Sequence, residues 1–213
     1  MCAAPAISLQ FDSSIRQSLM EIKSIAIVGA SNLGRKIAYR AVLAGFRTIL
    51  EDISPAKLEQ GLAWVACALA EDLARGKCDR AAREAALGKL TTAKSAEEAS
   101  READLIIEAV PDEMEMKLEL FTIFDKFAKP GAIFASTTTS FLISDLASVT
   151  ACPERCIGMR FFGDAPDEER LELVKGCNTS KETIAACLEA GRRLAATVSI
   201  LQDRHVLAAG GRD

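Results

Sequence analysis

Histidine is almost absent from this chain of 213 residues, in which His205 is the single example. A mechanism that needs a histidine general base therefore has one candidate, and metal sites built on several histidines are excluded. The seven cysteines form no C-x-x-C pair, and Cys152-x-x-x-Cys156 has no histidine nearby to complete a zinc site. We expect reduced structural thiols and no metal site.

The sequence also lacks a basic run, a long apolar run and a targeting segment. Its 30 acidic residues are interleaved with 26 basic ones, for a net charge of −4, which gives no electrostatic footprint for nucleic acid. No window reaches the length of a membrane span, and Met1–Pro5 carries no basic residue. These absences predict a cytoplasmic protein without a nucleic-acid or membrane partner.

Apolar strand-like segments alternate with helical segments along most of the chain. Strands are predicted at 25–28, 47–51, 105–109, 132–136, 156–161, 171–174 and 197–201. Helices are predicted at 35–44, 55–75, 79–90, 113–128, 143–148 and 180–195. Fully apolar strands separated by helices are typical of a parallel sheet covered on both faces, so we predict an α/β fold with a doubly wound, mostly parallel sheet.

A glycine-containing turn follows the first predicted strand and precedes a helix. Its six residues, all predicted to bind a dinucleotide, are Gly29, Ala30, Ser31, Asn32, Leu33 and Gly34. Gly29 permits a tight turn, Gly34 lets the helix pack on the strand, and the helix N-terminus offers unpaired N–H groups to a pyrophosphate. Ser31 replaces the middle glycine of the usual fingerprint, where its hydroxyl either donates to the phosphate or crowds it.

Asp52 follows the second predicted strand, at about the 20-residue spacing after the turn at which an acid accepts from the adenosine ribose. Because its charge and that of the adjacent Glu51 repel a 2′-phosphate, the sequence favours NAD over NADP. We therefore predict a Rossmann-type domain at 22–203, with an N-terminal extension and short helix at 1–21 and a tail at 204–213. The helices at 55–75 and 79–90 form an αα-hairpin inserted in this domain.

Several further segments occur in a characteristic order. They are Ile106-Ile107-Glu108-Ala109-Val110-Pro111-Asp112, Lys117-x-x-Leu120-Phe121, Ile133-Phe134-Ala135-Ser136-Thr137-Thr138-Thr139-Ser140, Pro153-Glu154-Arg155-x-Ile157-Gly158-Met159, Phe161-Phe162 and Leu171-Glu172-Leu173-Val174. In order and spacing they resemble the short-chain L-3-hydroxyacyl-CoA dehydrogenase family. The resemblance covers about residues 24–203 and implies the NAD-binding, N-terminal domain of that family.

The resemblance implies hydride transfer between NAD and the 3-hydroxyl carbon of an acyl-CoA. The family's substrate serine matches Thr139, and the glutamate that orients its base matches Glu172. Further positions predicted to bind the cofactor are Ala109, Val110, Asp112, Lys117 and Thr137, the last standing where the family has asparagine. In the inserted hairpin, Arg75 and Lys77 are the cations that could contact CoA.

The chain departs from the family at the general base. The family's histidine directly precedes Phe-Phe, and Arg160 stands there, whose guanidinium keeps its proton at neutral pH. The N-P-x-P segment that follows in the family is Gly163-Asp164-Ala165-Pro166 here, continued by the acidic Asp167-Glu168-Glu169. His205 either rescues the missing base or is a plain surface histidine, and we expect the family's C-terminal all-helical domain to be absent.

Three hypotheses follow for function. The first is an NAD-dependent dehydrogenase of 3-hydroxyacyl-CoA or a related 3-hydroxy acid, with weak activity because Arg160 replaces the base. The second is a catalytically silent NAD(H)-binding or partner-binding protein in which Arg160 and Glu172 form an ion pair. In the third, a separate helical subunit or a second copy of the chain completes the site.

Overall fold

The computed structural model describes residues 21–163 and 170–203. The predicted N-terminal extension, apart from residue 21, and the tail with His205 lie outside the described residues, as does the acidic segment at 164–169.

The described residues form one eight-stranded sheet with the order β3-β2-β1-β4-β5-β6-β7-β8. The strands are β1 (Ser24–Val28), β2 (Arg47–Glu51), β3 (Leu90–Thr92), β4 (Leu105–Glu108), β5 (Ile133–Ser136), β6 (Cys156–Phe162), β7 (Arg170–Lys175) and β8 (Thr197–Gln202). Neighbouring strands run parallel except for the antiparallel pair of β6 and β7. The mostly parallel sheet predicted from the sequence is confirmed.

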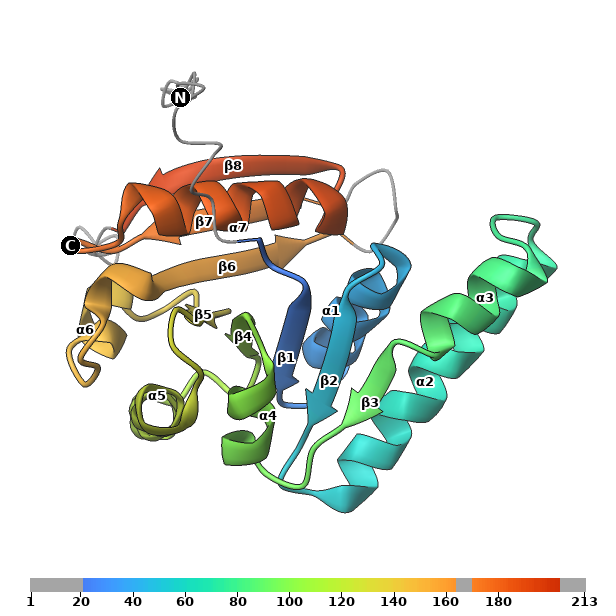
Figure 1. Ribbon diagram of the computed structural model, residues 1–213, viewed down its shortest axis with the longest axis horizontal. Helices are drawn as coiled ribbons and strands as arrows, with labels where there is room; N and C mark the ends of the chain where they lie inside the picture. Colours follow the sequence, from blue (N-terminus) through green and yellow to red (C-terminus); the bar gives the residue numbers. More distant parts are fainter. Residues whose placement is uncertain (1–20, 164–169, 204–213) are drawn as a thin grey trace, which may run out of the picture.

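Helices cover both faces of the sheet (Figure 1). One face packs against α1 (Asn32–Leu43), α2 (Pro55–Ala74), α3 (Arg80–Leu87) and α7 (Lys181–Leu194). The other packs against α4 (Ala96–Glu102), α5 (Met114–Phe127) and α6 (Ile143–Ala147), and a 3-10 turn at Pro153–Arg155 precedes β6. Each face buries its own apolar core, as a doubly wound fold requires.

At the carboxyl ends of β1 and β4 the topology has the switch point at which doubly wound folds form a ligand-binding crevice. These adjacent parallel strands lead into helices on opposite faces, because α1 follows β1 on one face and α5 follows β4 on the other. Loops that diverge in this way leave the space in which doubly wound proteins bind their ligands. The turn at 29–34 and the segment at 109–112 border this space.

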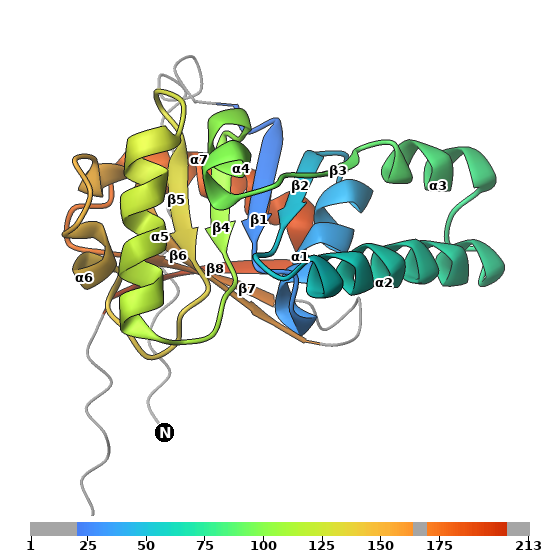
Figure 2. The same ribbon diagram turned by 90° about the horizontal axis from the view of Figure 1, so that it is seen from below.

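The helices α2 and α3 form the expected hairpin, which extends beyond the β3 edge of the sheet (Figures 1 and 2). Its two predicted CoA-binding cations are paired with acids of the hairpin itself: Arg75 lies 3.2 Å from Glu71, and Lys77 lies 3.7 Å from Asp72.

Two elements between the hairpin and β4 were not predicted. The helix expected at 79–90 ends at Leu87, and the edge strand β3 begins at Leu90, followed by α4 at 96–102. The strand β3 has only three residues, two of them exposed threonines, and α4 buries only Ala96, Ala99 and Ser100. Neither carries the apolar periodicity from which the other elements were predicted.

The six cysteines within the described part of the chain are free thiols. Burial raises the pKa of Cys187 to about 12, so this thiol is held in its protonated form inside the core. Across the described ranges, the helices are too short or too polar to cross a membrane.

Candidate functional site

The turn after β1 requires both of its glycines. Gly29 has a positive φ of 108°, and a Cβ there would lie 2.7 Å from the carbonyl oxygen of Ala109. A Cβ on Gly34 would lie 1.8 Å from the carbonyl oxygen of Gly29. The first turn of α1 thus packs directly on the loop, and the loop packs on the end of β4.

The N-terminus of α1 is not capped by a side chain. Ser31 occupies the N-cap position in an extended conformation, and its hydroxyl donates to the carbonyl oxygen of Ala109 over 3.3 Å instead of accepting from the helix. The first N–H groups of the helix, on Asn32, Leu33 and Gly34, are therefore left to an external acceptor such as a phosphate. Because the single proton of the Ser31 hydroxyl is directed at Ala109, the two alternatives for Ser31, donation to the phosphate or crowding of it, both stay predictions.

Asp52 is hydrogen-bonded to the glycine turn. One carboxylate oxygen accepts from the N–H of Ala30 at 2.9 Å, and the other accepts from the N–H of Ser54 at 2.8 Å. Since each carboxylate oxygen can accept more than one hydrogen bond, both remain able to accept from ribose hydroxyls.

Glu51, the last residue of β2, is buried beside this acid. Burial, together with the negative charges of Asp52 and Glu97, raises the pKa of Glu51 to about 7. A 2′-phosphate at this position would meet the charge of Asp52 and, at higher pH, that of Glu51.

A buried ion pair lies beneath the end of β4. The Lys117 ammonium is 2.8 Å from both carboxylate oxygens of Glu108, and both side chains are almost completely buried. The Ser136 hydroxyl donates to Glu108 at 2.6 Å, and the Val110 N–H donates to it at 2.8 Å. These hydrogen bonds fix the loop that follows β4. They also hold the Lys117 ammonium in the protein interior, beneath this loop, and not on the protein surface.

Asp112 extends this network toward the surface. It accepts from the Thr138 hydroxyl at 2.6 Å and lies 3.4 Å from the Lys117 ammonium. Burial raises the pKa of Asp112, but hydrogen bonds from Thr138 and Ser140 and the charge of Lys117 outweigh it and hold the pKa below its ordinary value. Asp112 is therefore an ionised hydrogen-bond acceptor at the crevice.

Arg160 lies near the end of β6 and is hydrogen-bonded to the loop after β5. Its Nε donates to the carbonyl oxygen of Thr138 at 2.8 Å. Glu172 faces Arg160 in the register of β6 and β7, but its ion pair, at 3.7 Å, is with Arg170. The predicted ion pair between Arg160 and Glu172 is therefore wrong: the Thr138 carbonyl draws the arginine toward the β5 loop, and Arg170 on the same strand as Glu172 takes its place.

The structure gathers the site residues predicted from the sequence into two groups. The first comprises the turn 29–34, Asp52 and Ala109, joined by the hydrogen bonds described above. The second comprises Asp112, Lys117, Thr139 and Arg160 around Thr138, and the Thr139 N–H lies 3.4 Å from Asp112. Val110 and Thr137 connect the groups, since their N–H groups donate to Glu108, through its carboxylate and its carbonyl oxygen respectively. Glu172 joins the second group only by strand register.

Sequence reasoning assigned no role to Glu108, Ser136 or Thr138, which hold these groups together. A signal was present, because Glu108 and Ser136 each end an otherwise apolar, fully buried strand, and Thr138 lies two residues beyond the second of these strands. A polar group in such a place needs a buried partner.

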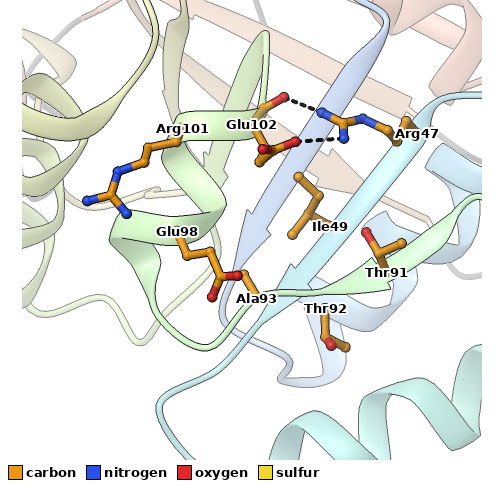
Figure 3. A pocket seen from close by; sticks show the side chains of 8 residues that line it. All are labelled: Arg47, Ile49, Thr91, Thr92, Ala93, Glu98, Arg101 and Glu102. Carbon is orange, nitrogen blue, oxygen red and sulfur yellow. Dashed lines mark hydrogen bonds and ion pairs between the residues drawn. The ribbon is translucent and has the colours of Figure 1, made fainter.

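Two pockets lie near these elements. One of about 150 Å³ joins the start of α1 to the end of β6 and is lined by Asn32, Leu33, Lys36, Arg40, Phe161 and Gly163. The other, of about 220 Å³, lies between α4 and the strands β2 and β3 (Figure 3). Its Arg47 is paired with Glu102 at 2.8 Å, and it contains none of the predicted site residues. We assign this second pocket no part in the site.

A metal centre finds no support in residues 21–163 and 170–203. Within these ranges, no three histidine, cysteine, aspartate or glutamate side chains cluster so that they could hold an ion.

Comparison with known proteins agrees with this geometry. The family described as "3-hydroxyacyl-CoA dehydrogenase, NAD binding domain" matches residues 24–203. A probable 3-hydroxybutyryl-CoA dehydrogenase of Bacillus subtilis is 34% identical over 184 residues, which is 86% of this chain and 64% of that protein. A 3-hydroxybutyryl-CoA dehydrogenase of Bradyrhizobium diazoefficiens is 34% identical over 182 residues, 85% of this chain and 62% of that protein.

Among solved structures, the (S)-3-hydroxybutyryl-CoA dehydrogenase of Ralstonia eutropha superimposes with a TM-score of 0.81 at 30% identity, over 86% of this chain and 65% of that one. The chain thus spans less than two thirds of the length of these relatives. Since the family match extends over most of the chain, the protein belongs to the 3-hydroxyacyl-CoA dehydrogenase family, of which it carries the NAD-binding domain.

Proposed function

We propose that the chain is an NAD(H)-binding oxidoreductase domain whose hydride transfer with a 3-hydroxyacyl-CoA, or a related 3-hydroxy acid, is weak or lost. The names of the curated relatives, both 3-hydroxybutyryl-CoA dehydrogenases, support this substrate class. The single observation that carries the weak activity is the place of Arg160, bound through Nε to the Thr138 carbonyl oxygen.

The residues present fit NAD. The uncapped start of α1 offers N–H groups to the pyrophosphate, and the close packing of this turn excludes a Cβ at Gly29, which would meet the Ala109 backbone, and at Gly34, which would meet the Gly29 backbone. Asp52 would accept from the adenosine ribose, and Asp112 would accept from groups at the nicotinamide end. When bound, NAD supplies the hydride acceptor, and the chain orients it between the loops after β1 and β4.

Among the described residues, neither Arg160 nor Asp112 is suited to accept the hydroxyl proton. A guanidinium stays protonated and can only donate, and no histidine occurs in the described ranges. Asp112 is a poor base, because its hydrogen bonds and Lys117 hold its pKa low. Loss of a positioned general base slows a reaction by about 10²- to 10⁴-fold, so we expect turnover to be slow or undetectable.

Restoring an imidazole tests this proposal. NADH oxidation with acetoacetyl-CoA is measured for the native chain, for Arg160→His, and for Arg192→His, which places the same residue on the exposed side of α7. We expect Arg160→His to exceed the native rate by about 10²-fold and Arg192→His to match it. In this direction the imidazolium donates the proton that the ketone oxygen gains, so the gain should be present below about pH 6.5 and fall as the imidazole loses its proton.

Native turnover faster than about 1 s⁻¹ would contradict the proposal, because that rate is ordinary for an enzyme with its base in place. Equal rates for the native chain and Arg160→His, with unchanged NADH affinity, would show that Arg160 is not what limits the reaction.

The second candidate function is a silent NAD(H)-binding protein, in which no substrate is turned over. The same contact of Arg160 with the Thr138 carbonyl oxygen favours this function. It differs from the first in one expected result: NADH would bind, but acetoacetyl-CoA would not be turned over even by Arg160→His.

The proposal also concerns the protein partners of this chain. The curated relatives extend beyond the part that this chain matches, so in them further residues are available to the site. We propose that a second copy of the chain or a separate helical subunit covers the crevice here. Light scattering coupled to size-exclusion chromatography distinguishes a homo-oligomer from a monomer that requires a separate subunit. The cytoplasmic location of the protein stays a prediction.

A further inference from the structure

Arg160 is held in place by a rigid loop. The Thr138 hydroxyl donates to Asp112 and accepts from the N–H groups of Ser140 and Phe141, at 3.3 and 3.1 Å. The Thr138 N–H in turn donates to the Ser136 hydroxyl at 3.1 Å. With its own backbone fixed in this way, the Thr138 carbonyl oxygen fixes the Arg160 guanidinium through Nε.

Among the described residues, most of the Arg160 guanidinium has no hydrogen-bond partner. An arginine side chain carries five N–H donors, and within residues 21–163 and 170–203 only the Nε of Arg160 makes a hydrogen bond. The four donors on the two terminal nitrogens form the fork that matches a carboxylate in two parallel hydrogen bonds.

The charge of Arg160 is likewise not neutralised by a neighbour in the described ranges. Glu172, opposite on β7, pairs with Arg170, and Asp112 is engaged by Thr138 and Lys117. A half-buried cation without a carboxylate within ion-pair distance favours an anionic ligand.

Two hydroxyls flank the residue that holds Arg160. Thr137 and Thr139 stand on either side of Thr138, and neither hydroxyl has a hydrogen-bond partner among the residues that the structure describes. The Thr139 side chain is on an exposed residue and that of Thr137 on a half-buried one. Both are further donors on the segment whose Thr138 carbonyl oxygen holds Arg160, and the Thr139 N–H lies 3.4 Å from Asp112.

We propose that Arg160 binds the carboxylate group of a small organic acid at the substrate end of the site, with Thr137 and Thr139 as additional donors. This inference rests on the proposed function, because it names the substrate class of the same site. A planar carboxylate suits the guanidinium fork, because its two oxygens accept two parallel hydrogen bonds from the terminal nitrogens. The Arg160 that cannot serve as a base thus selects a free acid.

Calorimetric titration with a matched pair of ligands tests the inference. Acetoacetate carries the carboxylate, and acetoacetamide has the same shape without the charge. Each is titrated into the native chain with and without saturating NADH. We expect acetoacetate to bind at least tenfold more tightly than acetoacetamide, because charge-assisted pairing is lost in the amide.

Variants assign the effect to this residue. Arg160→Gln should weaken acetoacetate binding at least tenfold, to the level of acetoacetamide, and Arg160→Lys should fall between because it keeps the charge but not the fork. Arg192→Gln removes the same charge from an exposed place on α7 and should leave acetoacetate affinity unchanged. Thermal unfolding of each variant shows whether it is folded. If Arg160→Gln does not fold, the native chain is compared with Arg160→Lys instead.

The outcomes separate this inference from the proposed function. Equal affinity of the native chain and Arg160→Gln for acetoacetate, or no binding of acetoacetate with or without NADH, overturns the inference. If the native chain binds NADH in either of these cases, the proposed function is retained while the inference fails. If NADH does not bind but acetoacetate binds through Arg160, the proposed function fails and the carboxylate site remains.

Discussion

Glu51 is an acid buried at the end of β2, 5% exposed, next to Asp52, the acid that we propose binds the ribose. Its pKa of about 7, against an ordinary value of 4.5, means that the folded chain keeps this proton over a range in which the unfolded chain has released it. The free energy of unfolding contributed by Glu51 therefore falls as the pH rises from about 4.5 to 7, and its cost is fully present above that range.

Replacement of Glu51 by glutamine should remove this cost. We expect Glu51→Gln to raise the free energy of unfolding by about 1–3 kcal/mol at pH 8 and to change it little at pH 4, measured by urea denaturation. Glu59→Gln, on an exposed residue of α2, is the matched control and should show no such difference. A gain of equal size at both pH values would mean that the protonation of Glu51 is not its source.

The pair of Lys117 and Glu108 is a second test at the residue scale. Lys117→Met leaves the Glu108 carboxylate buried without its cation, so we expect a loss of about 3–5 kcal/mol in the free energy of unfolding. The double variant Glu108→Gln with Lys117→Met should lose less than Lys117→Met alone, because no uncompensated charge remains. Lys126→Met, exposed on the same helix, should cost little. A double variant as unstable as the sum of both single variants would contradict this account.

At the scale of elements, the sequence predicted those whose apolar pattern matches their burial. The strand at 24–28 is buried at every position, and α7 buries apolar residues at helical spacing, among them Ile184, Cys187, Leu188 and Leu194, so both could be predicted from their apolar pattern. The strand β3 and the helix α4 could not, because an edge strand of two exposed threonines and a helix that buries alanines carry too little apolar pattern.

The candidate site divides in the same way. The turn and Asp52 could be predicted because backbone conformation and spacing constrain them locally. The bond between Arg160 and the Thr138 carbonyl could not, since it joins the end of β6 to the loop after β5 and depends on side-chain direction. The expected pairing of Arg160 with Glu172 followed strand register alone.

The packing of α1 on β1 can be tested with Gly34→Ala. A methyl group there would lie 1.8 Å from the Gly29 carbonyl oxygen, so the helix would have to move away from the turn. We expect a loss of about 3 kcal/mol or more in the free energy of unfolding and a large loss of NADH affinity. Gly88→Ala, whose methyl group would lie 3.4 Å from the Glu84 carbonyl oxygen, is the control and should change neither by much. Wild-type NADH affinity in Gly34→Ala would show that the turn does not receive the pyrophosphate.

At the scale of the whole molecule, the doubly wound sheet brings distant segments to one crevice. The turn after β1, the acid after β2, the network after β4 and the arginine on β6 meet at one edge of the sheet, because parallel strands share the direction of their carboxyl ends. The glycine turn and Asp52 lie at one end of this crevice, and Arg160, which we propose stands in place of a base, lies at the other. The molecule is therefore built to hold a dinucleotide whether or not it performs the reaction of its relatives.

Calorimetric titration of NADH into the native chain tests this central claim most directly, with Asp52→Asn and NADPH as comparisons. We predict saturable binding of one NADH per chain, weakened about tenfold by Asp52→Asn, which loses the charged acceptor of the ribose hydroxyls. NADPH should bind at least tenfold more weakly, because its 2′-phosphate meets Asp52. No binding of NADH, or equal affinity for NADH and NADPH that Asp52→Asn leaves unchanged, would contradict the account.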